Sequence, residues 1–192
     1  MPSMSETKTY RINEIFYSLQ GEGFHTGTPA VFIRFSGCNL RCSWCDTNFS
    51  AFTLMTAEQI VAECMKLQKN CMLLLTGGEP ALHADEALIN MLHEAGYTSV
   101  AIETNGTRPL PEGIDWVTCS PKEGTHVVLQ EADEVKIVYT GQDVEKWLTR
   151  IKSEHNYLQP CSLKNTKRIV SYILRHPWWR LSLQTQKYIG MK

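Results

Sequence analysis

Short apolar runs alternate with helical segments along this chain, and this alternation is the feature that most limits its fold. The apolar runs that favour strands span residues 30–35, 72–75, 99–102, 115–118, 134–139, 156–159 and 180–183, and the helical segments span about 56–69, 85–95, 144–152 and 166–175. Such alternation is typical of parallel strands joined by right-handed crossovers. We therefore expect an α/β fold with mostly parallel strands, a partial or small barrel, formed by residues 1–192 as a single domain.

Polar, glycine-rich or proline-containing motifs directly follow several of these strands. They include a cysteine-containing loop after residue 35 and the segments 76–80, 103–107 and 120–122. In parallel α/β folds, ligands bind at the carboxyl ends of the strands. We therefore expect these segments to line one mouth of the fold.

Three cysteines in the first of these loops, Cys38, Cys42 and Cys45, have the spacing C-x3-C-x2-C. No fourth cysteine follows at a matching interval, whereas a [4Fe–4S] cluster normally takes four cysteine ligands. Three thiolates would leave one iron open to a small molecule. A zinc site would require a fourth ligand, for which no histidine is near, and a disulfide framework is typical of smaller extracellular chains. The spacing therefore favours a cluster that acts as a reaction site.

The composition is that of an ordinary globular protein, with 43% hydrophobic and 20% charged residues. The formal net charge of −1 argues against an electrostatic grip on nucleic acid, which needs a basic face. The first eight residues are polar, and no run approaches the ~20 apolar residues that a membrane span needs. Together with the free cysteines, these features favour a cytoplasmic protein that binds neither nucleic acid nor membrane.

Other residues around the loop have both functional and structural interpretations. The turn Thr76-Gly-Gly-Glu-Pro80 could pair with an amino-acid-like ligand, or it could be a plain turn. Gln20 and Glu22 suit the edge of a heterocycle, but their segment is also typical of a glycine-rich hairpin. Arg34 lies in an apolar strand, where it must be paired, either with a substrate carboxylate or in a structural ion pair.

Asp46 and Thr47, which follow the third cysteine, could hold magnesium or cap the next element. Four cysteines lie outside the loop, and each is expected to act as a small buried hydrophobe. Two of these, Cys119 and Cys161, follow strands and could approach the site. The six histidines form no pair at metal-ligand spacing.

The combined motifs resemble those of the 7-carboxy-7-deazaguanine synthases, a family of radical S-adenosylmethionine (SAM) enzymes. The resemblance covers nearly the whole chain, and it rests on segments 19–23, 27–34, 38–47, 76–80, 102–106, 120–122, 158–160 and 179–185. It implies a partial barrel of the radical SAM type. It also implies that a reduced cluster and SAM produce a 5′-deoxyadenosyl radical, which acts on 6-carboxy-5,6,7,8-tetrahydropterin. Ring contraction with loss of ammonia then gives 7-carboxy-7-deazaguanine, on the pathway to queuosine, and the cofactor carries the hard chemistry.

Carried over residue by residue, the resemblance implies a role for each matched position and no catalytic residue beyond the cofactor. The [4Fe–4S] cluster would bind Cys38, Cys42 and Cys45, and magnesium would bind Thr47. The SAM site would comprise Trp44, Asp46, Gly78, Glu79, Ser120, Pro121, Lys122, Gln159, Pro160, Cys161 and Ser162. The pterin site would comprise Leu19, Gln20, Gly21, Glu22, Arg34, Thr76 and the chain-end Lys192. A reducing flavodoxin or ferredoxin and a second copy of the chain, in a homodimer, are the implied partners.

The chain departs from the family pattern near its end, where Gln186 stands in place of a histidine that many members carry. A glutamine cannot become a cation near neutral pH, so a proton-transfer role at this position is in question. Two alternatives stay open. A glycyl-radical activase carries the same cysteine spacing, and an iron–sulfur electron carrier would take a fourth ligand, with Cys119 and Cys161 as the candidates.

Overall fold

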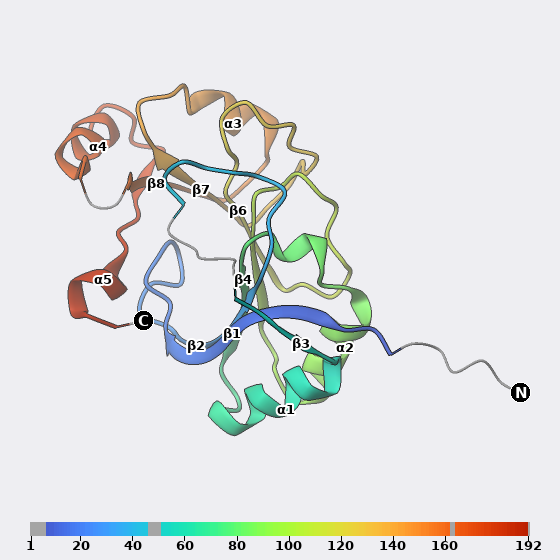
Figure 1. The fold of residues 1–192 in the computed structure, drawn as a ribbon. Coiled ribbons are helices and arrows are strands. Elements are labelled where there is room, and N and C mark those ends of the chain that lie inside the picture. Colours follow the sequence, from blue (N-terminus) through green and yellow to red (C-terminus); the bar gives the residue numbers. More distant parts are fainter. Residues whose placement is uncertain (1–6, 46–50, 162–163, 192) are drawn as a thin grey trace, which may run out of the picture.

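A nine-stranded sheet forms the centre of the computed structural model, which describes residues 7–45, 51–161 and 164–191 (Figure 1). The strands are β1 (Tyr10–Leu19), β2 (Pro29–Phe35), β3 (Thr53–Met55), β4 (Met72–Gly77), β5 (Val100–Thr104), β6 (Trp116–Cys119), β7 (Glu134–Tyr139), β8 (His155–Pro160) and β9 (Arg180–Leu181). Their order across the sheet is β3-β1-β2-β4-β5-β6-β7-β8-β9. Within the described residues the sheet ends at β3 and β9 without closing, and the expected partial barrel is confirmed.

The strands from β2 and β4 through β9 pair in parallel, as the alternation of strands and helices predicts. β1 and β3 pair antiparallel at one edge and were not expected. The sequence of β1, Tyr10-Arg-Ile-Asn-Glu-Ile, mixes polar and apolar residues because this strand lies near the edge of the sheet. The continuous apolar runs that identify buried parallel strands are therefore missing from it.

The structure describes five helices, of which the first four cover the outer surface of the curved sheet. They are α1 (Ala57–Leu67), α2 (Glu86–Glu94), α3 (Glu145–Arg150), α4 (Thr166–Ile173) and α5 (Thr185–Ile189), with a 3-10 turn, η1 (Pro80–Leu82). Figure 1 shows α1 and α2 against the half of the sheet that contains β1 to β5, and α3 and α4 against the other half. The first four match the predicted helices, each two or three residues shorter than expected, whereas α5 was not predicted. None of the helices in the described part of the chain has the length and apolarity that a membrane crossing needs.

The core has two main parts, one beneath each half of the sheet. Ile33, Leu73 and Ile102 on the inner strands pack with Ile60 of α1 and the apolar face of α2. Around β7 and β8, Ile137 and Leu158 pack with Trp147 of α3 and with Trp179, which is 1% exposed. Buried apolar strands of this kind fix the backbone from which the polar residues at the strand ends project.

The β1–β2 connection, residues 20–28, crosses from one side of the open sheet to the other, and we call it the hairpin tip. Its backbone meets the last strands and the C-terminal segment, because Thr185 N donates to Gly21 O at 2.9 Å and Gly23 N donates to Ser182 Oγ at 2.9 Å. Figure 1 shows α5 beside the hairpin. The tip therefore connects two regions that are about 160 residues apart in sequence.

Candidate active site

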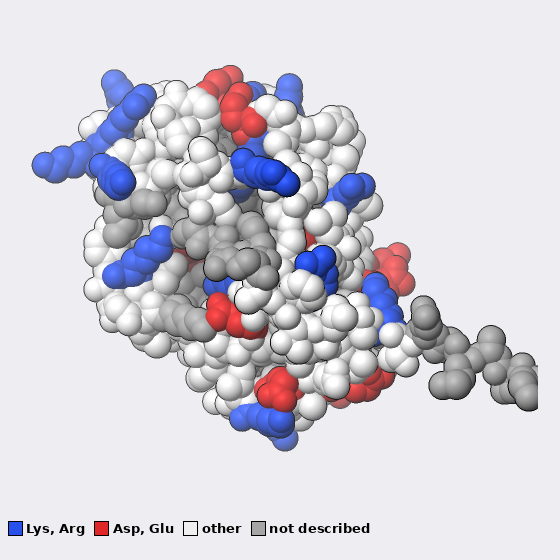
Figure 2. All heavy atoms as spheres, viewed as in Figure 1, with Lys and Arg blue, Asp and Glu red and all other residues white. Residues whose placement is uncertain are grey.

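A cavity of about 1000 Å³ opens at the carboxyl ends of the parallel strands. Its lining includes the cysteine loop, Gly78 after β4, Asn105 after β5 and Ser120 after β6. The expectation that the polar motifs share one mouth is therefore confirmed. Figure 2 shows that Lys and Arg side chains are interspersed with Asp and Glu on this face of the molecule.

Most of the predicted site residues that the structure describes line this cavity. They are Gln20, Glu22, Arg34, Cys38, Cys42, Trp44, Cys45, Thr76, Gly78, Ser120, Lys122, Gln159, Pro160 and Cys161. Leu19, Gly21, Glu79 and Pro121 are absent from the lining. Asp46, Thr47, Ser162 and Lys192 lie outside the described residues.

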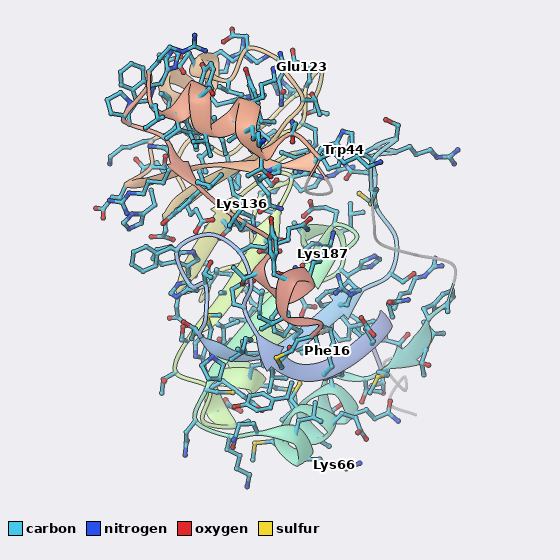
Figure 3. The ribbon with its side chains drawn as sticks, turned by 90° about the vertical axis from the view of Figure 1, so that its left-hand side faces the viewer. Phe16, Trp44, Lys66, Glu123, Lys136 and Lys187 are labelled. Atoms are coloured by element: carbon cyan, nitrogen blue, oxygen red, sulfur yellow. The ribbon has the colours of Figure 1, made fainter. Side chains whose placement is uncertain are left out.

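A buried ion triad lies in the interior of the mouth. Lys136 projects from β7, and its Nζ lies 2.8 Å from Glu22 Oε2 and 2.6 Å from Glu103 Oε1. The side chain of Lys136 is 6% exposed, whereas Glu22 and Glu103 are 15% and 21% exposed. Figure 3 shows Lys136 inside the curve of the sheet. The lysine thus holds two carboxylates at the surface of the cavity while being almost entirely enclosed itself.

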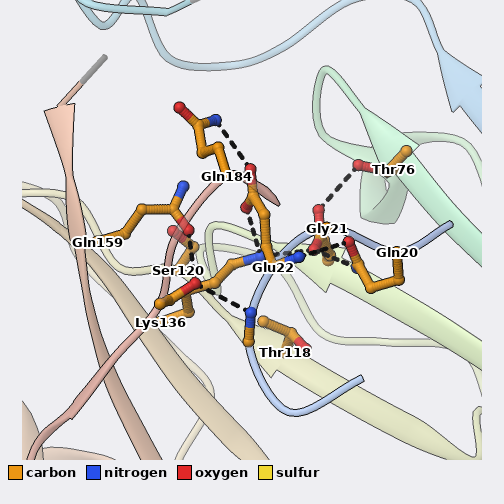
Figure 4. A network of polar contacts seen from close by, with 12 residues as sticks. Gln20, Gly21, Glu22, Thr76, Thr118, Ser120, Lys136, Gln159 and Gln184 are labelled. Carbon is orange, nitrogen blue, oxygen red and sulfur yellow. Dashed lines mark hydrogen bonds and ion pairs between the residues drawn. The ribbon is translucent and has the colours of Figure 1, made fainter. Parts of the chain in front are cut away.

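The two carboxylates have further partners that fix their orientation (Figure 4). Gln184 Nε2 donates to Glu22 Oε1 at 2.8 Å. Glu103 accepts from Gln20 Nε2 at 3.2 Å and from Thr76 Oγ1 at 3.1 Å. These donors come from the hairpin tip, from β4 and from the C-terminal segment, so together with Lys136 on β7 four separate parts of the chain donate to the two carboxylates.

Glu22 and Lys136 of the triad keep their charges in the folded protein. Burial alone would raise the pKa of Glu22, but the neighbouring Lys136 outweighs it and lowers the pKa to about 2. Burial alone would lower the pKa of Lys136, and the two carboxylates raise it instead. Two carboxylates and one ammonium leave one net negative charge, which favours a ligand that offers N–H donors.

Arg34 lines the same cavity from β2, and its Nε donates to Glu14 Oε1 at 2.9 Å. The structural ion pair that the sequence allowed is therefore present. A guanidinium has further N–H donors on its two terminal amino groups, and Arg34 also lines the cavity. The ion pair and a contact with a ligand carboxylate are thus compatible.

The cysteine loop contributes three thiols to the lining of the cavity. Leu40 N donates to Cys38 Sγ at 3.4 Å, and Cys45 N donates to Cys42 O at 3.2 Å. Within the described residues no three ligating side chains converge on a single metal ion. In a cubane cluster each thiolate binds a different iron, and three thiols for four irons leave one iron for another ligand. The three thiols, all at the lining of one cavity, therefore fit an iron–sulfur cluster.

The two further cysteines that could have served as a fourth ligand differ in position. Cys119 is fully buried, is absent from the cavity lining, and its thiol pKa is raised to about 12 by burial. Cys161 is partly exposed and lines the cavity. Of these two cysteines, only Cys161 is therefore placed to be the fourth cluster ligand that the electron-carrier interpretation requires.

Lys122 lies next to the cysteine loop. Its Nζ donates to Ser120 O at 2.7 Å and to Ser120 Oγ at 2.6 Å, and it lies 5.3 Å from the centre of the Trp44 ring. Burial lowers the pKa of its ammonium group. Lys122 donates to the backbone and the hydroxyl of Ser120, and a cation removed from water is costly unless an anion pairs with it, so the position suits an anionic ligand such as the carboxylate of an amino acid.

The Gly-Gly-Glu-Pro turn packs against the start of the cysteine loop. Glu79 N donates to Gly37 O at 2.9 Å, and a Cβ on Gly78 would lie 1.8 Å from Gly37 O. A glycine at position 78 is therefore needed for the close approach of two backbone segments. The Glu79 side chain is 0% exposed and accepts hydrogen bonds from Thr104 Oγ1, Asn105 N and Ala81 N. Its carboxylate fixes the β4 and β5 ends relative to each other.

Three residues of the central network had no individual role predicted. Glu103 and Gln184 lie within the segments 103–107 and 179–185 that the sequence analysis singled out, whereas Lys136 was missed altogether. A signal was present for Lys136, because it lies in the apolar strand Glu134–Tyr139 just as Arg34 lies in an apolar strand. A charge facing a core must be paired, and applying this rule to β7 would have identified Lys136.

Three comparisons with known proteins bear on this site. The Radical SAM superfamily matches residues 32–164. The 7-carboxy-7-deazaguanine synthase of Bacteroides thetaiotaomicron is 61% identical over 182 residues, which cover 95% of this chain and 98% of that protein. The enzyme of the same name from Bradyrhizobium diazoefficiens is 39% identical, and the match covers 96% of this chain and 100% of that protein.

A solved structure agrees with these relatives. The crystal structure of QueE from Escherichia coli superimposes with a TM-score of 0.77 at 31% sequence identity. The match covers 91% of this chain and 93% of that one. The likeness therefore extends over most of both chains.

Proposed function

The chain belongs to the 7-carboxy-7-deazaguanine synthases of the radical SAM superfamily, and we propose that its mouth binds the pterin substrate between the hairpin tip and the cysteine loop. The enzyme is a radical SAM lyase that forms 7-carboxy-7-deazaguanine in queuosine biosynthesis. The substrate that we assign to the mouth is 6-carboxy-5,6,7,8-tetrahydropterin. The glycyl-radical activase alternative is not supported, since the relatives carry the synthase name.

The observation that carries this assignment is the ion triad of Glu22, Lys136 and Glu103. The pterin ring has an amino group and a ring N–H on one edge, and both are hydrogen-bond donors. Two ionised carboxylates fixed by one buried lysine are well suited to accept from them. Arg34, which lines the same cavity from β2, is suited to the 6-carboxylate of the substrate.

The cluster and SAM are supported by the superfamily match and by the three thiols. When bound, they supply the hydrogen-abstracting radical chemistry of the superfamily. We propose that Cys38, Cys42 and Cys45 hold the cluster, and that Trp44, Gly78, Ser120 and Lys122 hold SAM with the segment 159–161. The role of the protein is to bind both molecules in one enclosed mouth, to orient them and to exclude water.

Several finer assignments complete the proposal. Magnesium would bind near Asp46 and Thr47, which lie outside the described residues. The chain would act as a cytoplasmic homodimer and accept electrons from a flavodoxin or ferredoxin. Sedimentation with and without the cluster would test the dimer, and turnover with added magnesium chloride would test the cation.

The experiment that tests the function is anaerobic turnover followed by mass spectrometry. The reconstituted protein is mixed with SAM, dithionite, magnesium and 6-carboxy-5,6,7,8-tetrahydropterin. We expect 7-carboxy-7-deazaguanine, together with 5′-deoxyadenosine in less than stoichiometric amount because SAM is regenerated. Formation of 5′-deoxyadenosine without the deazaguanine would contradict the assigned substrate. Loss of the cluster in Cys161→Ala would contradict the three-cysteine assignment and favour an electron carrier.

A further inference from the structure

Another buried carboxylate, Glu134, lies on β7 two residues before Lys136 and on the same face of the strand. The residue is 2% exposed, and it begins the strand at the end remote from the mouth. It does not line the cavity. A carboxylate in this position needs an explanation, since burying an ionisable group is costly and Glu134 does not touch the substrate site.

Among the described residues, the carboxyl group of Glu134 accepts one hydrogen bond, and its donor lies in the hairpin tip. Phe24 N donates to Glu134 Oε2 at 2.9 Å, whereas Glu134 Oε1 is buried without a hydrogen-bond partner in the described part of the chain. The carboxyl group also packs directly on Gly23, because a Cβ at that position would lie 2.1 Å from Glu134 Oε1. Gly23 has a φ of +64°, so a side chain there would be strained as well as obstructed.

Adjacent contacts hold the same piece of backbone. Gly23 N donates to Ser182 Oγ, and Ser182 Oγ in turn donates to Gln159 Oε1 at 2.8 Å. The Phe24 ring stacks on His155 at 4.3 Å and on Trp116 at 4.9 Å between ring centres. The tip is therefore fixed on both sides of Gly23, and Glu22 is the residue immediately before this fixed point.

We propose that Glu134 is a positioning residue, which holds the backbone of Gly23 and Phe24 so that the carboxylate of Glu22 faces the pterin. The inference rests on the proposed function, in which Glu22 accepts hydrogen bonds from the substrate. Glu134 acts through the hairpin backbone and does not touch the pterin. The geometry requires an oxygen acceptor at this place, and it does not require a negative charge.

The difference between an acceptor and a charge gives the test a matched pair of variants. Glu134→Gln keeps a carbonyl oxygen that can accept from Phe24 N, whereas Glu134→Ala removes the acceptor. Glu131→Ala is the control, because Glu131 is a nearby glutamate whose side chain is 73% exposed. Each protein is titrated anaerobically with 6-carboxypterin, an oxidised analogue that does not react, by following the pterin fluorescence.

We expect Glu134→Ala to weaken the binding of 6-carboxypterin about tenfold, the effect of losing one buried hydrogen bond. KM for the tetrahydropterin should rise by a similar factor, and more 5′-deoxyadenosine should form for each product molecule. Glu134→Gln and Glu131→Ala should both stay within about twofold of the unchanged protein. Unchanged binding by Glu134→Ala would overturn the proposal, and so would an equal loss in Glu134→Gln.

A double-mutant cycle covers the case in which Glu134→Ala folds poorly. The Cβ introduced by Gly23→Ala collides with the Glu134 carboxyl group, so this change should weaken binding strongly in the unchanged protein. In the Glu134→Ala background the collision is removed, and the loss of affinity should be about fivefold smaller. If the two changes weaken binding by factors that simply multiply in the double variant, the proposed contact between Glu134 and the hairpin backbone is contradicted.

The outcomes separate this inference from the proposed function. If the unchanged protein binds no 6-carboxypterin and forms no deazaguanine, the proposed function fails. If the unchanged protein binds and turns over normally while Glu134→Ala does the same, only the positioning role fails.

Discussion

The two sides of the mouth are built in different ways. On the hairpin side, Lys136, Glu22 and Glu103 are enclosed, and residues from four parts of the chain donate to the carboxylates. On the cysteine side, Cys38 and Cys42 are partly exposed and Cys45 is exposed, and one turn bond and one N–H to sulfur contact are recorded in the loop itself. One side is organised by the charges of the protein, and the other presents ligands for an inorganic group.

The difference indicates which property each side must have. Substrate binding requires acceptors at fixed positions before the ligand arrives, because ordering them later would lower affinity. A cluster imposes its own geometry on the thiolates that bind it, so the protein only needs to bring them near. Changes on the cysteine side should therefore remove all radical chemistry, whereas changes on the hairpin side should alter binding, coupling and stability.

The largest effect is expected for Cys42→Ala on the cysteine side. With two thiols left, the cluster should be lost, and both 5′-deoxyadenosine and the deazaguanine should fall below about a thousandth of their normal rates. Iron content and anaerobic turnover measure this. Cys71→Ala is the control, because Cys71 lies outside the mouth and packs against the core, and it should keep its cluster. An active Cys42→Ala protein would contradict the assigned ligands.

The next effect is expected for Lys136→Met, which leaves Glu22 and Glu103 buried without their counter-charge. We expect a loss of about 3 kcal/mol in the free energy of unfolding at neutral pH, measured by urea denaturation. Adding Glu22→Gln should recover part of this loss, because one uncompensated charge is then removed. Lys152→Met is the matched control, since Lys152 is 81% exposed and should change the free energy by less than about 0.5 kcal/mol. Equal losses in the two lysine variants would contradict the role of the triad.

A smaller effect is expected from the ionisation of Glu134. Burial raises its pKa from 4.5 to about 7, against the opposing effects of Lys136 and Phe24 N. Glu22 and Glu103 also raise it. The folded protein therefore holds this proton more tightly than the unfolded chain does, and stability from this group falls as the pH rises through that range.

The unchanged protein should accordingly lose about 1 to 3 kcal/mol relative to Glu134→Gln between about pH 5 and pH 8. Urea denaturation of both proteins at each pH measures this difference. Glu131→Gln should show no such pH-dependent difference. A gain in relative stability with rising pH would contradict the raised pKa of Glu134.

The smallest effect is expected for Gln186→His. Gln186 Nε2 lies 3.4 Å from Glu22 Oε1, so its amide is a weak partner of the triad. A histidine should change kcat/KM by less than about threefold and should add a dependence on pH near 6.5, the ordinary pKa of an imidazole. Gln130→His, on an exposed residue outside the mouth, should add none. A tenfold loss in Gln186→His would show that the position tolerates only the amide.

Local patterns in the sequence predicted much of the fold and one side of the mouth. The apolar runs identified the parallel strands, and the spacing of Cys38, Cys42 and Cys45 lies within a single loop, so no long-range contact was needed. β1 was missed because its polar and apolar residues are mixed, as its place near the sheet edge allows. α5 was missed because a helix of five residues has too few positions to show a periodic pattern.

The hairpin side could not be predicted in the same way. Lys136 meets Glu22 across 114 residues and Glu103 across 33, and sequence spacing gives no measure of such contacts. The chain order of the strands gave no sign that the hairpin tip crosses the open sheet to Ser182 and Thr185. Glu22, Arg34 and Thr76 were assigned to the pterin through a family resemblance, and Lys136 was outside the motifs that carry it.

The central claim is that the cysteine side makes the radical and the hairpin side directs it to the pterin. The ratio of 7-carboxy-7-deazaguanine to 5′-deoxyadenosine in Glu22→Gln, measured by mass spectrometry in anaerobic turnover, tests it most directly. The change keeps the size of the side chain and replaces an acceptor of the triad with a neutral amide. We predict that 5′-deoxyadenosine still forms while the ratio falls by about a hundredfold, the cost of a lost charge-assisted hydrogen bond. An unchanged ratio, or a parallel loss of both products from protein with its full iron content, would contradict the claim.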